Sequence, residues 1–171
     1  MLYSRPSRDE CPEYYFAYID KVPDGDILDL LSTQVDNTAS YLASLPPELG
    51  TYRYADGKWT VSEVLGHMVD CERVFAFRGL HIARGDKTPI PGFEQDDWVA
   101  STDFNRRSIK SLADELHVLR ASTVMLFKNL TAEEIERTGT ASGYPFSVRT
   151  IPYIIAGHEI HHLGVLKDRY V

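Results

Sequence analysis

The sequence predicts an all-α fold, most simply a four-helix bundle. Four long stretches carry apolar residues at spacings of three and four, the pattern of an amphipathic helix. Capping residues precede these stretches, and proline or glycine follows the first two of them. No stretch alternates apolar and polar residues over enough positions to indicate a β-sheet, so no strands are expected.

The first predicted helix follows an irregular segment, residues 1–23, whose aromatic residues we expect to pack onto the body of the domain. Asp24 or Asp26 can cap this helix, since a side-chain carboxylate accepts hydrogen bonds from the free N–H groups of a first turn. Apolar residues then recur with helical spacing, and Pro46 and Pro47 end the helix.

The second predicted helix runs from about Val61 to Ala83. Thr60 and Glu63 form a capping box at its start, in which each side chain bonds the backbone N–H group of the other residue. Gly85 is well placed to end the helix, because glycine readily adopts the left-handed conformation found after many helices.

A loop of residues 86–102 comes next, and loops of this length often have a function. The third helix has a nearly unbroken apolar repeat from Ile109 to Leu130. A second capping box, residues 131–134, starts a short helix or turn. Ser147 can cap the last helix. One face of that helix carries Ile151, Ile154, Ile155, His158, His162 and Val165.

Composition and charge narrow the class of protein. The length suits a single domain, residues 1–171, with the irregular segment at its start. Acidic residues outnumber basic ones by 25 to 18, a net charge of −7, which argues against nucleic acid or an anionic membrane as partner. The sequence shows neither a signal peptide nor a membrane span. Cys11 and Cys71 are too few for a disulfide framework, so we expect a cytoplasmic protein with reduced thiols.

The segment G-H-E-I-H-H near the end of the sequence contains the candidate functional site. His158 and His162 lie one turn apart on the apolar face of the last helix, so both imidazoles should point into the core. A buried polar group without a partner costs about 1–3 kcal/mol. A metal ion would satisfy both rings; hydrogen bonds to the helix end or to a neighbour are the alternative. His161 is expected at the rim of this face.

The same segment matches the H-E-x-x-H pattern of zinc proteases, but its context argues against that class. Val165 and Asp168 stand where the metzincin pattern has a glycine and a third ligand. Too few residues follow His162 to supply a later ligand, and Glu159 lies toward a flank of the histidine face. We therefore interpret the match as incidental.

A third ligand would have to come from an earlier helix. His67, on the edge of the apolar stripe of the second helix, is the best-placed candidate, and His81 and His117 are alternatives. Cys71 follows His67 by one turn and could reach the same site, although a free cysteine more often packs as a small buried apolar residue.

Two motifs together resemble the DinB/YfiT-like superfamily and, within it, the DinB-2 subgroup. They are K-W-T-V-x-E-V-L-x-H, which ends at His67, and P-Y-I-I-A-G-H-E-x-H-H-L-G-V-L, which begins at Pro152. The resemblance implies a four-helix bundle that binds a divalent metal, most often zinc or nickel. The ligands that it implies are His67, His158 and His162. It also implies a homodimer.

Three histidine ligands would leave at least one coordination position open, as in catalytic sites. Such a position can lower the pKa of bound water or hold a substrate thiolate. The resemblance therefore implies a small-molecule enzyme, either a hydrolase or a transferase that uses a thiol such as bacillithiol, mycothiol or glutathione. A metal-binding protein without catalysis, closed by Cys71 or a carboxylate, and a metal-free interaction module are the alternatives.

Further residues are candidates for supporting roles. Glu72 lies within the apolar stripe of the second helix and needs a partner. The available partners are Arg120, Arg149 and a ligand histidine. Glu72, Glu159 and His161 are candidates for hydrogen bonds to the metal ligands. Arg78, three turns after His67, could bind an anionic group of a substrate, but an exposed surface arginine is the simpler expectation.

Overall fold

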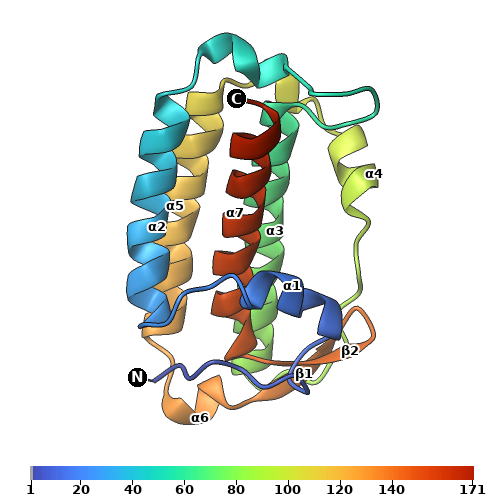
Figure 1. Cartoon of the computed structure of the whole chain (residues 1–171). Coiled ribbons are helices and arrows are strands. Elements are labelled where there is room, and N and C mark those ends of the chain that lie inside the picture. Colours follow the sequence, from blue (N-terminus) through green and yellow to red (C-terminus); the bar gives the residue numbers. More distant parts are fainter. Residues whose placement is uncertain (1) are drawn as a thin grey trace.

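The computed structural model describes residues 2–171, and four long helices form a bundle in it (Figure 1). They are α2 (Ile27–Ala43), α3 (Val61–Ala83), α5 (Ile109–Lys128) and α7 (Thr150–Arg169). Helix α5 packs against α2 and α3, and α7 packs against the same two helices from the other side. Consecutive helices α2 and α3 therefore occupy opposite corners. The predicted four-helix bundle is confirmed, and its helices begin close to the expected residues.

The capping residues act as the sequence predicts. The Asp26 carboxylate accepts hydrogen bonds from two backbone N–H groups of the first turn of α2, at 2.9 and 3.3 Å. Thr60 and Glu63 form a complete capping box at the start of α3. Gly85 follows the end of that helix with a φ of 78°. Ser147 is an exception: the N-cap residue of α7 (Thr150–Arg169) is Arg149, which makes no side-chain capping bond, and the Ser147 hydroxyl accepts from the backbone N–H of Thr150 at 3.3 Å.

The buried apolar residues form two clusters, one at each end of the bundle. The boundary between them falls between residues 69 and 71 on α3, between residues 116 and 127 on α5, and between residues 156 and 166 on α7. The buried histidines lie at or near this boundary, as do the buried charged residues Glu72, Arg120 and Glu159, whereas Arg78 lies about two turns of α3 beyond it. A polar layer thus interrupts the core about midway along the helices, and each buried polar side chain in it needs a hydrogen-bond partner.

One prediction about the fold is wrong: the chain contains a β-hairpin. Strand β1 (Thr138–Ala141) pairs with β2 (Tyr144–Ser147) in antiparallel register. Ser142 and Gly143 join the strands with φ values of 53° and 81°, as a two-residue type I′ turn requires. Four-residue strands are too short for a detectable alternation. Residue Ile90 of the long loop also bridges to Ala141, which ties that loop to the hairpin.

Three short helices lie outside the bundle, two of them in segments where no helix was expected. Helix α1 (Phe16–Ile19) lies within residues 1–23 and crosses α7 (Figure 1). Helix α4 (Gln95–Ala100) lies in the long loop, and α6 (Ala132–Ile135) begins at the predicted second capping box. Three 3₁₀ turns span Glu13–Tyr15, Pro47–Thr51 and Phe104–Arg106. Among the helices of residues 2–171, none has the length and apolar character that crossing a membrane requires.

Gly157 determines how closely α1 can approach α7. A Cβ atom at this position would overlap the carbonyl oxygen of Tyr18. The missing side chain therefore lets the backbone of α1 rest on α7 directly. This contact places the ring of Tyr18 edge-on against the rings of His158 and His161, at centroid distances of 5.4 and 5.3 Å.

We expect Gly157→Ala to lower the free energy of unfolding by about 1–3 kcal/mol, because α1 must move to make room for the methyl group. Gly164→Ala is the matched control on the same helix, since nothing lies within 4 Å of a Cβ atom there. Removing that helical glycine should stabilise the protein by about 0.5–1 kcal/mol. Urea unfolding of both variants measures the difference. Equal effects would show that the α1 contact is not tight.

Glu10 fastens the N-terminal segment to the start of α7. Its carboxylate accepts two hydrogen bonds from Arg149, at 2.7 and 2.9 Å, and one from Ser147 at 2.7 Å. Burial alone would raise the pKa of Glu10, but these bonds and those from Ser7 outweigh it and lower the pKa to about 2. Arg149, considered above as a partner for Glu72, is thus paired with Glu10 instead.

Glu10→Gln should lower the free energy of unfolding at pH 7 by about 1–2 kcal/mol. The folded pKa lies below the ordinary value of 4.5, so this stabilisation is present above pH 4.5 and is lost as the pH falls toward 2. Urea unfolding across this pH range should show the wild-type advantage disappear. Glu13→Gln is the control, because Glu13 forms an exposed ion pair with Arg8. A Glu10 effect independent of pH would contradict the assignment.

Candidate metal centre

Three histidines from two neighbouring helices converge inside the bundle. His67 comes from α3, and His158 and His162 come from α7. The Nε2 atom of His158 lies 3.1 Å from Nε2 of His67 and 3.1 Å from Nε2 of His162. The Nε2 atom of His158 thus lies close to the same atom of both other rings, whereas the donors that all lie within 4.8 Å of one another are those of His67, Cys71 and His158. The structure brings together the three residues that the family resemblance implies as ligands.

Burial keeps these imidazoles neutral near pH 7. Loss of solvent, with a contribution from neighbouring histidines, lowers the pKa of His67 to about 4 and that of His162 to about 3. The same causes lower the pKa of His158 well below its usual range. A neutral imidazole has a lone pair free for a metal, whereas a protonated one has none.

The donor spacing fits a metal ion better than it fits hydrogen bonds. Two nitrogens bonded to one zinc ion lie about 3.3 Å apart in a tetrahedral site and about 2.9 Å apart at right angles, from bond lengths of about 2.0–2.1 Å. The observed 3.1 Å falls between these values. By hydrogen bonding alone, Nε2 of His158 would have to donate to one ring only, or accept two protons on one lone pair.

Cys71 adds a fourth potential donor. Its Sγ atom lies 3.6 Å from both ring nitrogens of His67, and single atoms of His67, Cys71 and His158 are close enough to share one ion. Sulfur and nitrogen ligands of a tetrahedral zinc ion lie about 3.6 Å apart. In the protein alone, burial and the charge of Asp70 raise the pKa of this thiol to about 12. Mutual proximity thus groups His67, Cys71 and His158, and His162 joins this group through its contact with His158.

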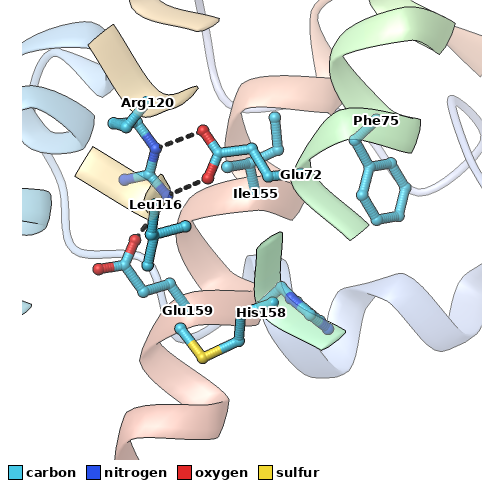
Figure 2. Close-up of a pocket in the computed structure, with 8 residues that line it drawn as sticks. Glu72, Phe75, Leu116, Arg120, Ile155, His158 and Glu159 are labelled. Carbon is cyan, nitrogen blue, oxygen red and sulfur yellow. Dashed lines mark hydrogen bonds and ion pairs between the residues drawn. The ribbon is translucent and has the colours of Figure 1, made fainter. Parts of the chain in front are cut away.

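A buried ion cluster lies beside the histidines. Figure 2 shows Glu72 and Glu159 converging on the guanidinium of Arg120. Arg120 donates two bonds of 2.8 Å to Glu72 and one of 2.6 Å to Glu159, and all three side chains are at most 3% exposed. The hydroxyl of Thr38 donates to the other oxygen of Glu159. Arg120 is therefore the partner that Glu72 was expected to need.

The charges of this cluster do not cancel, because one guanidinium faces two carboxylates. The two carboxylates raise the pKa of Arg120 and outweigh the opposing effect of burial. His158 lines a cavity of about 10 Å³ together with Glu72, Arg120 and Glu159, roughly the space of one water. A cation among the histidines would lie close to this excess negative charge, which favours binding of a positive ion.

The protease-like motif is not assembled as in a zinc protease. His158 and Glu159 are adjacent in α7 but point in different directions (Figure 2). Both carboxylate oxygens of Glu159 are engaged, one by Thr38 and one by Arg120. Glu159 is thus a buried member of the ion cluster. It was expected toward a flank of the histidine face, and it is more deeply buried than that position suggested.

The other histidines lie outside the cluster. His161 is partly buried at the rim, as expected, where burial and the charge of Lys21 lower its pKa. His81 contacts the carbonyl oxygen of Thr88 at 2.9 Å, and His117 contacts the exposed Asp36 at 3.0 Å. Of the three candidates for a ligand from an earlier helix, only His67 reaches the pair on α7.

Two larger cavities reach the histidines from the surface. One, of about 490 Å³, is lined by Cys71 and His158 and also by Arg78. The other, of about 340 Å³, is lined by His161 and His162. Asp96 of α4 lines both, so the long loop borders each opening. Small molecules can therefore approach the histidine cluster from two sides.

Arg78 is not an exposed surface arginine: it is 1% exposed. The hairpin and the N-terminal segment cover the part of α3 that carries it, and its guanidinium donates to the hydroxyl of Ser142 in the hairpin turn at 2.7 Å. The expectation was wrong because no strands were expected to cover this part of α3. A turn signal at Ser142-Gly143 was the available clue.

Known proteins with similar sequences and structures share the family and the bundle fold of this chain. The sequence pattern of the DinB superfamily, in its DinB_2 form, matches residues 30–166. The chain belongs to the DinB superfamily. The resemblance seen in the two histidine motifs is therefore confirmed at the level of the family.

Two curated relatives are about a quarter identical to this DinB-superfamily chain over the regions that align. A "putative metal-dependent hydrolase" of Oceanobacillus iheyensis is 26% identical over 139 residues, 80% of this chain and 79% of the relative. A protein of the same name from Geobacillus thermodenitrificans is 27% identical over 137 residues, 78% of this chain and 76% of the relative. Both names describe a metal-dependent enzyme.

Solved structures show the same fold. YfiT from Bacillus subtilis, described as a probable metal-dependent hydrolase with an unusual four-helix bundle topology, superposes with a TM-score of 0.70. The match covers 97% of this chain and 91% of YfiT at 16% identity. A mycothiol-dependent maleylpyruvate isomerase superposes with a TM-score of 0.66 at 15% identity, over 85% of this chain and 61% of the isomerase.

Arg120→Met should lower the free energy of unfolding by about 3–5 kcal/mol, because Glu72 and Glu159 would be buried without a countercharge. The matched control is Arg84→Met, which removes a half-exposed partner of Glu134 and should cost about 1 kcal/mol or less. Urea unfolding in the presence of a chelator compares the two without interference from bound metal. A loss in Arg120→Met no larger than in the control would show that the buried cluster does not hold the helices.

Proposed function

We propose that this protein holds one divalent cation, zinc or nickel, through His67, His158 and His162, and acts as a metal-dependent enzyme on a small molecule. The observation that carries the proposal is that Nε2 of the buried His158 lies 3.1 Å from Nε2 of His67 and 3.1 Å from Nε2 of His162, beside an accessible cavity. The names of the curated relatives support the same class of protein.

A divalent cation in such a site acts as a Lewis acid that lowers the pKa of a bound water or thiol. The protein's own residues perform the other tasks. The three histidines bind and orient the ion, and their burial keeps them unprotonated. Asp96 at the openings and Tyr18 beside His158 border the space in which a small molecule would lie.

The reaction class follows from which group enters the open position. Water would make the protein a hydrolase, as the names of its curated relatives suggest. A low-molecular-weight thiol would make it a thiol-dependent transferase, and the mycothiol-dependent isomerase of the same fold supports this alternative. The cavity of about 490 Å³ beside His158 has room for more than one small reactant.

A second candidate function is a metal site without catalysis. The position of Cys71, with Sγ 3.6 Å from Nε2 of His67, favours it, because a thiolate there would complete a closed tetrahedral set. Substituting cobalt for the native metal distinguishes the two functions. Absorption from thiolate-to-cobalt charge transfer that disappears in Cys71→Ser would indicate the closed site. If the wild-type protein shows no such absorption, Cys71 does not bind the metal and the fourth position is open.

Untagged protein purified without chelator should contain about one zinc or nickel ion per chain by elemental analysis, since the described residues gather one buried group of donors. His67→Asn, His158→Asn and His162→Asn should each lose most of this metal. His117→Asn is the control, because His117 lies on the surface beside Asp36, and should retain it. Wild-type protein that stays metal-free after incubation with both ions would contradict the proposal.

Protein that passes this test can be screened for hydrolysis of small esters and amides and for thiol transfer. Hydrolysis should require the metal and no added thiol, whereas transfer should require both. Loss of metal in His67→Asn should abolish either activity. Activity that survives complete metal removal would place the chemistry elsewhere in the protein.

A further inference from the structure

Arg78 and Arg120 are the two most deeply buried arginines of the described chain, each 1% exposed, and their surroundings differ. Arg120 has two carboxylate partners. Arg78 forms no ion pair with any carboxylate of residues 2–171, and its Nε–H group has no hydrogen-bond partner there. A buried charge without a countercharge is costly unless something else compensates it. The protein alone therefore leaves Arg78 incompletely compensated.

The contacts that Arg78 does make are neutral. Its guanidinium donates to the hydroxyl of Ser142 at 2.7 Å and lies 3.5 Å from the hydroxyl of Tyr15. Three aromatic rings also surround it, those of Phe75, Phe93 and Phe146, at 5.3, 6.0 and 5.7 Å. Aromatic faces attract a cation, by about 2 kcal/mol or more each when desolvated, but they carry no negative charge. These groups position the guanidinium without neutralising it.

Arg78 lines the same cavity as Cys71 and His158. Arg78 follows Cys71 by seven residues, so the two lie on the same face of α3, about 10 Å apart along the helix. The cavity thus connects an uncompensated positive charge to one edge of the histidine cluster. A single small molecule can reach both.

We propose that this cavity binds a small molecule with one carboxylate, which pairs with Arg78 while the reactive end of the molecule points toward His158 and Cys71. Arginine suits this task because its planar fork can donate two parallel hydrogen bonds to a carboxylate. The carboxylate half of the proposal stands on Arg78 alone. The orientation of the reactive end rests on the proposed metal-dependent function.

The lining of the cavity narrows the ligand further. Aromatic side chains of Tyr14, Tyr15, Tyr18, Phe75 and Phe93 form much of its wall, which favours a flat or apolar body. The carboxylates of Glu94 and Asp96 also line it, and would repel a second negative charge. The ligand class is therefore an aromatic or otherwise apolar monocarboxylate, in preference to a dicarboxylate or a phosphate ester.

The competing explanation is that Arg78 only anchors the hairpin turn through Ser142. Ser142→Gly separates the two roles. It removes the hydroxyl that accepts from Arg78, and glycine suits the positive φ at this position, so the turn itself should persist. Anion binding by Arg78 predicts that this variant still binds carboxylate. A purely structural arginine predicts no carboxylate binding in any form of the protein.

The test uses the metal-free full chain, with the side-chain Nε–H signal of Arg78 followed by ¹⁵N NMR and assigned by its absence in Arg78→Lys. Titration with benzoate should shift this signal to saturation, whereas neutral benzamide should not. Benzoate should bind roughly tenfold or more weakly to Arg78→Met, as expected when a charge-assisted hydrogen bond is lost, and about equally to wild type and Ser142→Gly. Phthalate, with two carboxylates, should bind more weakly than benzoate.

No saturable shift with benzoate or acetate in the wild type would overturn the proposal, as would unchanged benzoate affinity in Arg78→Met. Neither result depends on metal, so failure of the metal site leaves this test intact. Orientation is tested separately with metal-loaded protein and mercaptocarboxylates of increasing length. At least one should bind more tightly than the matching acid without a thiol, and only when metal is present. No such gain at any length would overturn the orientation toward His158.

Discussion

The pairing of one buried guanidinium with two carboxylates is the constraint on which the rest of the bundle depends. Arg120 on α5 holds Glu72 of α3 and Glu159 of α7, and Thr38 of α2 donates to Glu159, so every long helix contributes one member. Hydrophobic packing alone would tolerate small shifts of one helix along another. A buried charge does not, since any shift that breaks its bonds leaves an unpaired ion in the core. The cluster therefore fixes the relative height of the helices.

The relative height of the helices matters for the histidines. They come from two of these helices and lie near the level of the Arg120 cluster. Glu72 is five residues beyond His67 on α3, and Glu159 directly follows His158 on α7. The contacts that hold the carboxylates thus also fix the spacing of the imidazoles in the proposed metal site. The excess negative charge of the cluster then favours a cation at that place. The same ion cluster therefore holds the helices together and positions the histidines.

How far the sequence could predict this arrangement depended on whether each feature is local. The four long helices and their caps are local patterns, as is the inward direction of His158 and His162, and all were predictable. The choice of Arg120 over Arg149 as the partner of Glu72 depends on which helices are neighbours, which periodicity does not reveal. The hairpin was missed because its strands have four residues each. Missing it led directly to the wrong expectation of an exposed Arg78.

The two buried arginines, Arg120 and Arg78, differ in role: the first stabilises the fold, and the second is proposed to bind a ligand. Arg120 has its countercharges supplied by the chain, and an arginine in that state is stabilising only as part of its cluster. Arg78 has a similar degree of burial but neutral neighbours, and it borders a cavity that extends to the histidines. A buried charge that the chain leaves unpaired destabilises the fold. The same charge can bind a complementary anion strongly, because an ion pair is stronger where water is excluded. The same low solvent exposure therefore has opposite meanings at the two positions, and the neighbours of each guanidinium decide which applies.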